Sequence, residues 1–526
     1  MPKQKGSPIK QINIVKTMLE NPNGELSIAK LAKEAGCTRG RVYDLIDRLE
    51  EEKLVSRTKV TNPEKLISLL KKWQNEQDFI TYDISKLTNE VQERKRRELA
   101  RLVELPRGMR DFESNELAKI KLIREKFQET AQLFGFKQMA PSPIELFSTL
   151  EAKSGPAIRK EIYEFHDKGK RNVALRFDFT VGLTRYVAAQ KSLRLPAKIS
   201  AFGGVWRYDE PQKGRYRFFN QWNIEIYGKP NVETNAEVIE FTARLFDNLK
   251  LRNIIVDIND RNLVQSYINK IFDSNDEKLV GDILRAVDKI QKKRKGEILA
   301  EYKKEGYEED KLEKILEFSK IKGTPEEIES IFDVSGLESW DKLKQLWDSL
   351  KNRGINNIRI NFGIVRGLDY YSGMVFEVFD KTSDLGALAG GGNYDALTKA
   401  FGREDIGATG VAGGVERIIM RMEKQGVVEI PSTPRISVVY ATEEMLKPAM
   451  NLASKLRQSF IPVDVDLLGK NLKKQMTMAS DSKFTIIIAP KEYSSKAVVL
   501  RNMSDGKEKQ VPLKSILSNP RLYLKL

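Results

Sequence analysis

Residues 201–228 carry side chains suited to holding a polyphosphate. The second half of this stretch alternates like a half-buried strand, so Arg217, Gln221 and Glu225 share one face while Trp222 supplies the other. Further basic side chains come from the preceding strand and the connecting loop, namely Arg207, Lys213 and Arg215. The arginines stand directly beside aromatic residues, which a solvated hairpin with surface charges does not require. The pattern therefore predicts a two-stranded hairpin that forms a cationic floor for phosphate groups.

Residues 365–377 form a second cluster, in which one arginine meets two phenol groups. Arg366 is followed by Tyr370 and Tyr371, and Tyr371 shares a predicted strand face with Glu377. The glycines in this stretch allow tight turns or a close approach of the backbone. Arg366 could alternatively make an ion pair at the edge of the core. The neighbouring hydroxyls favour the wall of a binding site.

The composition limits the chemistry that these clusters can do. The chain has one cysteine, Cys37, and one histidine, His166. These counts exclude an intrachain disulfide, a thiolate zinc site, histidine triads and multi-histidine metal sites, so no metal is expected to be held by His or Cys. Acid, base or electrostatic work must come from carboxylates, Arg, Lys, Tyr or bound ions.

The cellular setting follows from the same composition. One cysteine fits a reducing cytosol. No apolar run approaches the roughly 18 residues that a membrane span needs, and the first residues lack the apolar core of a signal peptide. We therefore expect a soluble cytoplasmic protein without a membrane partner.

The charge of the chain favours an acidic partner. The sequence has 90 Lys and Arg against 74 Asp and Glu, a net charge of +16. From residue 431 onward we count 16 basic and 8 acidic residues, so half of the excess lies in this last part. A polyanion such as RNA is the expected partner for that end, and a merely soluble surface is the alternative.

Several units of an α/β chain follow from the patterning. They are a winged-helix-like unit (1–60), a charged helical linker (61–103), an α/β unit in two parts (104–269 and 351–427), a helical insertion (270–350) between them, and a last α/β unit (434–526) with a buried parallel sheet. The low apolar fraction of 270–350 favours a protruding module over one more layer of core helices. Ser27 is predicted to cap the first helix of a helix-turn-helix, which either enters a DNA groove or serves as a structural or RNA-touching appendage.

Residues 201–228 resemble motif 2 of class II aminoacyl-tRNA synthetases, most closely that of the histidyl-tRNA synthetases. Residues 365–377 resemble a signature of the same family. Shorter segments resemble other parts of it in the required order: 107–111 the opening peptide, Pro143 motif 1, 175–180 the segment that holds the ammonium group, 389–395 the glycine-rich floor, and 413–418 motif 3. Residues 470–476 and 511–513 resemble the anticodon-binding domain. The first hundred residues lie outside the resemblance.

The resemblance implies a fold and a reaction. The fold would be an antiparallel-sheet catalytic core with a helical insertion and a C-terminal anticodon-binding domain. The reaction would be ATP-dependent attachment of L-histidine to tRNA(His) through a histidyl-adenylate, which releases AMP and pyrophosphate. ATP would come with Mg²⁺, and the protein would be a homodimer through the motif 1 region. The N-terminal unit could bind nucleic acid as well.

The resemblance also assigns roles to residues. Arg207 would grip the α-phosphate, and Arg366 would lie across from it on the side of the attacking carboxylate. Arg215 and Arg417 would hold the outer phosphates. The histidine site would comprise Glu225 and Tyr371 for the imidazole, Asp178, Thr180 and Gln221 for the ammonium group, and Arg366, Tyr370 and Tyr394.

Three residues depart from the pattern of the family. Asn393 stands where arginine is usual, and Phe218 and Asn220 replace commoner polar residues in the second strand of motif 2. Two rival functions are a histidine-sensing regulatory paralogue and a nucleic-acid-binding regulator that uses a synthetase-like ligand domain. Regulatory paralogues usually lack the anticodon domain and have degraded ATP motifs. This chain has segments that resemble the anticodon domain, and it keeps the arginines of the ATP motifs.

Overall fold

The protein comprises two compact units, Met1–Arg110 and Asp111–Leu526. Its computed structural model describes residues 8–21, 26–75, 93, 96, 99, 102–154, 156–211, 214–290, 293–366, 371–383, 386–430 and 435–525. None of the helices in these ranges is long and apolar enough to cross a membrane.

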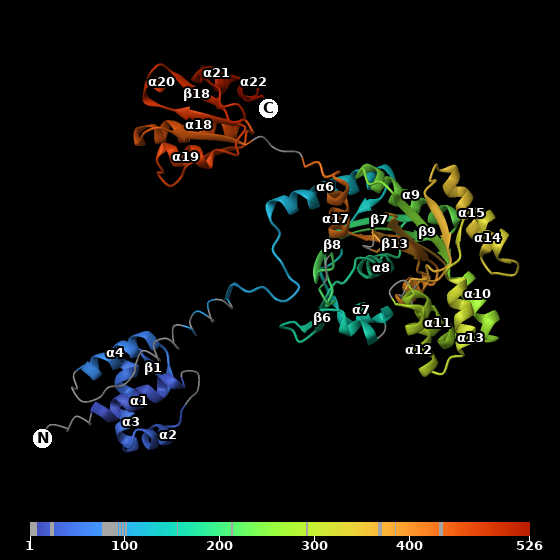
Figure 1. Cartoon of the computed structure of the whole chain (residues 1–526), viewed down its shortest axis with the longest axis horizontal. Coiled ribbons are helices and arrows are strands. Elements are labelled where there is room, and N and C mark those ends of the chain that lie inside the picture. The colour runs from blue at the N-terminus through green and yellow to red at the C-terminus, as the bar shows by residue number, and fades with distance from the viewer. Residues whose placement is uncertain are drawn as a thin grey trace. The chain divides into compact units, whose positions relative to one another are not determined.

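The first unit has helices around a two-stranded sheet (Figure 1). Its elements are α1 (Pro8–Glu20), α2 (Ile28–Glu34), α3 (Arg39–Glu51), β1 (Val55–Ser56), β2 (Lys59–Val60) and α4 (Pro63–Asn75). The predicted cap is confirmed, because the Ser27 side chain accepts a hydrogen bond from the Lys30 N–H at the start of α2. Leu66 and Leu70 of α4 are buried in the same hydrophobic cluster as α1 to α3, although they belong to the stretch expected to be a linker.

A nine-stranded sheet forms the centre of the second unit. In spatial order its strands are β10 (Lys322–Gly323), β11 (Ile358–Asn361), β9 (Ile254–Asp260), β12 (Met374–Asp380), β13 (Ala389–Asn393), β14 (Gly407–Gly414), β8 (Phe218–Gly228), β7 (Ala197–Trp206) and β3 (Lys137–Gln138). Neighbours from β9 to β7 are antiparallel, as expected, and only the β11–β9 and β3–β7 pairs are parallel. The predicted hairpin is β7 and β8, which pair from Ala197↔Tyr227 to Trp206↔Phe218.

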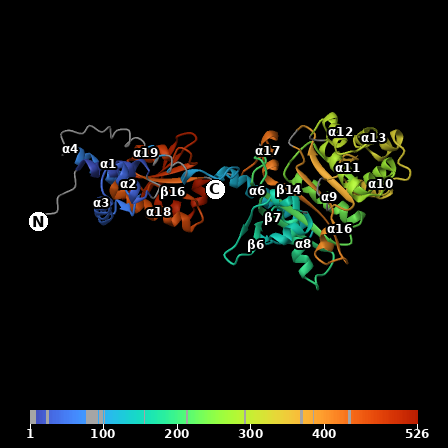
Figure 2. The same ribbon diagram turned by 90° about the horizontal axis from the view of Figure 1, so that it is seen from below.

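Helices cover both faces of this sheet. One face packs against α6 (Ser114–Leu133), α9 (Val232–Asn248) and α15 (Trp340–Asn352). The other packs against α8 (Thr180–Ala189) and α16 (Asp395–Ala400), which lie side by side (Figure 2). Strand β8 was predicted to be half-buried, and this was wrong: it is buried on both faces from Asn220 to Gly228. The polar side chains of that face lie beneath protein, not in bulk solvent.

The helices between the two parts of the sheet share its core. They are α10 (Arg261–Phe272), α11 (Glu277–Lys289), α12 (Lys295–Lys304), α13 (Glu309–Phe318) and α14 (Pro325–Ile331). Phe318 stacks on Phe362 at 4.7 Å between ring centroids, and buried Ile283 and Leu316 belong to the same hydrophobic cluster as Ile360 of β11.

A smaller sheet and one more helix complete the surroundings of the site. The sheet has the order β4 (Ile144–Leu146), β6 (Asn172–Leu175) and β5 (Glu164–His166), and α7 (Phe147–Ser154) packs on it. Strand β14 leads directly into α17 (Val415–Gln425). The chain therefore passes from the central sheet to Arg417 within one helical turn.

The last part of the chain forms a five-stranded sheet with helices. Its order is β16 (Val463–Val465), β15 (Ile436–Tyr440), β17 (Phe484–Ile488), β18 (Ala497–Asn502) and β19 (Glu508–Pro512), with α18 (Leu446–Gln458), α19 (Leu472–Met478), α20 (Pro490–Ser494), α21 (Leu513–Ser518) and α22 (Pro520–Leu524). The three strands that were expected to form a parallel sheet, β16, β15 and β17, do so. Strands β18 and β19 were not predicted, and they extend the sheet in antiparallel order. A short turn after Asn502 joins these two strands, and a connection of that length can only make a hairpin.

Candidate active site

The floor of the candidate site is a row of glycines in the two middle strands of the sheet. Cross-strand pairing runs from Glu225 of β8 to Gly410 of β14 and on to Gly392 of β13. A Cβ atom at Gly410 would lie 1.5 Å from Oε2 of Glu225, and one at Gly390 would lie 2.4 Å from Nη1 of Arg366. The missing side chains therefore leave space for two charged groups on one face of the sheet.

Glu225 is a buried carboxylate with several donors around it. Only 1% of its surface is exposed. Oε1 accepts hydrogen bonds from Thr180 Oγ1 at 2.8 Å and Asn223 Nδ2 at 3.2 Å, and Oε2 accepts one from the Tyr394 hydroxyl. Burial raises the pKa of Glu225 to about 7, although these hydrogen bonds oppose the rise and the charge of Asp178 adds to it. The group is therefore poised to change its charge near neutral pH.

Asp178 and Tyr371 lie near the same carboxylate, and we call the cluster of Glu225, Asp178, Tyr371 and Tyr394 the Glu225 slot. Asp178 is 6% exposed, and its Oδ1 accepts a hydrogen bond from the Val181 N–H at 3.3 Å. Tyr371 packs in one hydrophobic cluster with Tyr394, and a Cβ atom at Gly392 would lie 3.0 Å from its ring. The slot thus combines two carboxylates with two phenol groups.

Arg207 points its guanidinium along the polar face of β8. Its Nε donates to the Phe177 carbonyl at 2.9 Å, and its Nη2 donates to Gln221 Oε1 at 3.3 Å. The guanidinium lies 5.2 Å from the centre of the Phe219 ring. Gln221 in turn donates to Asn223 Oδ1 at 2.7 Å, which joins the arginine to the Glu225 group.

Arg366 lies on the other side of the glycine row. Its backbone has a φ of +57°, in the left-handed region that residues other than glycine rarely adopt. Nη1 donates to Glu377 Oε1 at 2.5 Å and Nη2 to the Tyr371 hydroxyl at 3.5 Å. Burial opposes the charge of Arg366, but Tyr371 and Glu377 outweigh it and raise the pKa above its ordinary value.

Arg417 and Arg215 extend the cationic surface. Arg417 donates from Nη1 to the Ala387 carbonyl at 2.9 Å, and the more exposed Arg215 pairs with Asp209 at 3.1 Å. Burial, followed by the charges of Arg215 and Arg207, lowers the pKa of Arg417. These three guanidinium groups therefore repel one another, and an anion bound among them would relieve the repulsion.

The site contains almost all of the residues that the sequence singled out. Tyr370 and Lys213 lie outside the described residues. Sequence reasoning gave no role to Asn223, which links Gln221 to Glu225, or to Tyr227, whose hydroxyl is 3.1 Å from Thr184 Oγ1. The alternation that places Gln221 and Glu225 on one strand face was the available signal for both.

The structure gives the contacts or position of each of the three residues that depart from the family pattern. Asn220 donates its N–H (2.9 and 3.0 Å) and its Nδ2 (3.1 Å) to the buried Glu416 carboxylate. The ring of Phe218 lies 5.0 Å from that of Trp206. Asn393 follows Gly392 in β13, so its side chain lies on the opposite face of the sheet from the slot.

The chain is similar to known proteins in both its sequence and its fold. Residues 108–418 match the family described as Histidyl-tRNA synthetase, and residues 432–519 match the family Anticodon binding domain. The Histidine--tRNA ligase of Pyrococcus horikoshii is 34% identical over 434 residues, which are 81% of this chain and 100% of that relative. The Histidine--tRNA ligase of Helicobacter hepaticus is 30% identical over 406 residues, 74% and 91% of the two chains. The crystal structure of histidyl-tRNA synthetase from Nostoc sp. has the same fold, with a TM-score of 0.65, 22% identity, and coverage of 80% of this chain and 99% of that one.

Proposed function

The chain belongs to the histidyl-tRNA synthetase family, and from this membership we propose that it attaches histidine to tRNA(His) through a histidyl-adenylate. The observation that supports the proposal most strongly is the buried Glu225 slot beside the cluster of arginines. ATP and histidine would form the adenylate and pyrophosphate. The tRNA 3′-terminal ribose would then take the histidyl group and release AMP.

In the proposed mechanism the arginines lower the barrier for attack on the α-phosphate. The histidine carboxylate must approach another anion, and negative charge builds on the phosphate oxygens in the transition state. Arg207 stabilises the α-phosphate, Arg366 orients the attacking carboxylate, and Arg215 and Arg417 hold the outer phosphates. All four guanidinium groups remain charged at neutral pH, so they act without any proton transfer.

The slot supports the choice of histidine over other amino acids. Glu225 accepts a hydrogen bond from one imidazole nitrogen, and the Tyr371 hydroxyl serves the other. Asp178, Thr180 and Gln221 hold the α-ammonium group. An amino acid without ring nitrogens would bring no further donor to the buried Glu225 carboxylate, whose charge would then stay costly. The Tyr394 hydroxyl already donates to Glu225 and holds the carboxylate in position.

Mg²⁺ is proposed to enter with ATP. The described residues offer no group of three or more His, Cys, Asp or Glu side chains arranged for a metal ion. The phosphate oxygens themselves would therefore supply most of its ligands. Bound in this way, the ion would neutralise phosphate charge in addition to the arginines.

Two further parts of the proposal concern assembly and location. Ile144 and Leu146 next to Pro143 are 45% and 49% exposed, while Glu145 between them is buried against Arg185. Exposed aliphatic side chains on a short strand suit a homodimer interface through this motif 1 region. The single cysteine fits a cytoplasmic location.

The N-terminal unit is proposed to contact nucleic acid. Arg39, Arg41 and Tyr43 are exposed in the first half of α3, the half that enters the groove in helix-turn-helix proteins. In full-length protein, Arg41→Ala should weaken duplex DNA or tRNA binding in gel-shift assays and leave histidine activation unchanged. Unchanged binding of both nucleic acids would assign the unit a structural role.

ATP–pyrophosphate exchange with each of the twenty amino acids tests the main proposal. Exchange should require histidine and no other amino acid, and histidylation of tRNA should follow at a comparable histidine concentration. Exchange with a different amino acid would overturn the specificity of the slot. Histidine binding without any exchange would instead favour the regulatory paralogue.

A further inference from the structure

Arg176 is a half-buried arginine to which the proposed mechanism assigns no role. It directly follows β6 and precedes Asp178 by two residues. Its guanidinium lies 4.6 Å from the centre of the Phe179 ring and 5.9 Å from that of the Trp206 ring. An arginine over aromatic rings gains cation–π stabilisation and loses freedom of movement. The side chain is therefore held in place by its packing.

The donors Nε and Nη1 of Arg176 bond to backbone carbonyls. Nε donates to the Gly204 carbonyl at 2.9 Å, and Nη1 donates to the Pro141 carbonyl at 2.7 Å. Burial lowers the pKa of Arg176 and the charge of Glu145 opposes this, but Glu145 is itself paired with Arg185 at 2.9 Å. The planar guanidinium therefore joins two backbone segments at a fixed distance from each other.

The backbone around Arg176 is joined to the same two segments. Its N–H donates to the Pro143 carbonyl at 3.0 Å, and its carbonyl accepts the Trp206 N–H at 3.0 Å. The next carbonyl along the chain, that of Phe177, accepts a hydrogen bond from Arg207 Nε at 2.9 Å. The end of β7 is therefore held against this segment by three hydrogen bonds, one of which comes from the Arg176 side chain.

These contacts fix the distance between the groups proposed to hold the two substrates. Asp178 and Thr180, proposed for the ammonium group of histidine, follow Arg176 within four residues. Arg207, proposed for the α-phosphate, directly follows β7. The reacting carboxylate must lie close to the phosphorus before it can attack, and a misplacement of about 1 Å can slow such a step roughly 100-fold. The register of the two segments should therefore matter more for the reaction than for binding.

We propose that Arg176 is a positioning residue that sets the register of residues 176–180 against the end of β7. The inference rests on the proposed function, because it gives Arg176 a part in forming the adenylate. Arg176 acts through Asp178 and Arg207, not through contact with a substrate. When Arg176 is replaced, each substrate keeps its own contacts, and only the position of one relative to the other changes.

ATP–pyrophosphate exchange and isothermal titration of the full-length protein test the proposal. Arg176→Met should lower kcat for histidine-dependent exchange roughly 10- to 100-fold, while the Kd for histidine and the Kd for ATP, each measured alone, stay within about threefold of the wild type. Arg176→Lys keeps the charge but lacks the planar fork that reaches both carbonyls. Its kcat should therefore lie between those of Arg176→Met and the wild type.

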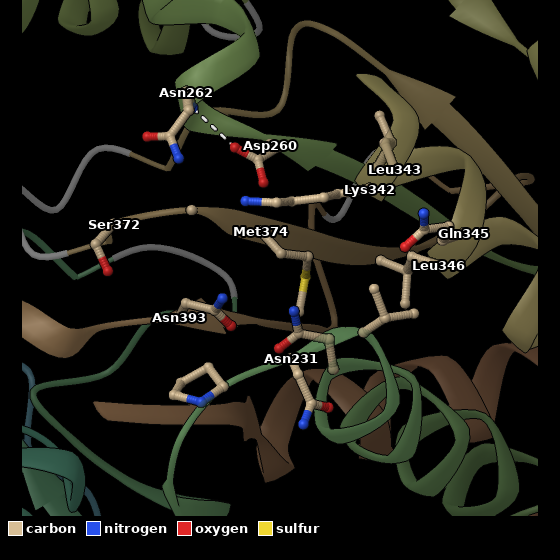
Figure 3. A pocket seen from close by; sticks show the side chains of 14 residues that line it. Asn231, Asp260, Asn262, Lys342, Leu343, Gln345, Leu346, Ser372, Met374 and Asn393 are labelled. Carbon is tan, nitrogen blue, oxygen red and sulfur yellow. Dashed lines mark hydrogen bonds between the residues drawn. The ribbon is translucent and has the colours of Figure 1, made fainter. Parts of the chain in front are cut away.

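Two variants control for the loss of a basic side chain. Arg457→Met removes a guanidinium that also donates to a backbone carbonyl, that of Val463, from Nε at 3.1 Å and from Nη2 at 2.7 Å. Lys342→Met removes an exposed basic side chain from a cavity of about 350 Å³ beside β9, β12 and β13 (Figure 3). Both variants should keep the kcat of the wild type.

Four results would overturn the proposal. One is an unchanged kcat in Arg176→Met. A second is a loss of affinity for either substrate as large as the loss in kcat, which would mean that Arg176 supports binding. A third is that both Arg176 variants are unfolded without urea, which would make the residue a part of the fold alone. The fourth is an equal loss of kcat in either control. Wild-type protein that gives no exchange with histidine would instead refute the proposed function.

Discussion

Replacing Glu225 by glutamine should make the protein more stable at alkaline pH while abolishing its activity. The carboxylate has a pKa of about 7 in the folded protein against 4.5 in an unfolded chain. The folded state therefore binds the proton more tightly, and stability is lost as pH rises from 4.5 toward 7. Between pH 5.5 and pH 8 the loss is about 2 kcal/mol by proton linkage. Glutamine carries no charge to desolvate, so this loss should vanish.

Urea unfolding followed by tryptophan fluorescence measures this effect. Four of the five tryptophans, Trp206, Trp222, Trp340 and Trp347, lie in the second unit, so the signal reports mainly on the sheet that holds Glu225. The difference in unfolding free energy between Glu225→Gln and wild type should grow by about 2 kcal/mol from pH 5.5 to pH 8. The exposed Glu404→Gln is the control and should follow the wild type.

Two results would refute this reasoning. Parallel stability curves for the wild type and Glu225→Gln would mean that the carboxylate does not titrate in this range. Histidine-dependent exchange at the wild-type rate in the glutamine variant would mean that the slot does not need an anion. A variant that is inactive yet more stable at pH 8 cannot have lost its activity by unfolding.

Other variants test the arginines and the glycine floor. Arg366→Ala should lower kcat for histidine-dependent exchange by about 100-fold or more while histidine binding persists, and Arg366→Lys should fare little better because lysine lacks the planar fork; exchange at the wild-type rate in either variant would contradict its role. Gly410→Ala should raise the KM for histidine by roughly tenfold or more, because its Cβ would collide with Glu225, whereas Gly296→Ala, which has no neighbour within 4 Å, should behave as wild type. Arg417→Ala should raise the KM for ATP and not that for histidine, and the reverse result would remove it from the phosphate site.

Local patterns predicted the elements of the site well. Alternation along residues 218–228 predicted β8, and the loop before it predicted its antiparallel partner β7. The family pattern then indicated which of the polar side chains belong together. The burial of both faces of β8 was not predicted, because α8 covers its polar face while α9 and α17, which come later in the chain, cover the other.

The long-range geometry of the site could not be predicted from the sequence. Nothing local marks Gly410 as the residue opposite Glu225, since that pairing depends on the register of strands far apart in the chain. The left-handed backbone of Arg366 is likewise imposed by its surroundings. In the last unit, the three apolar strands were predicted, whereas β18 and β19 were not, because β19 is mostly exposed and carries no apolar run.

Hydrogen bonds run without a break from Arg207 through Gln221 and Asn223 to Glu225, and every donor in the series points the same way. A molecule that donates a hydrogen bond to Glu225 competes with Asn223 for the carboxylate. It therefore changes how the Asn223 and Gln221 amides are held, and with them the orientation of Arg207. Thermodynamic linkage makes such an effect mutual, because each substrate must change the affinity of the other by the same factor. The binding of histidine and the binding of ATP are therefore expected to be coupled through these three contacts.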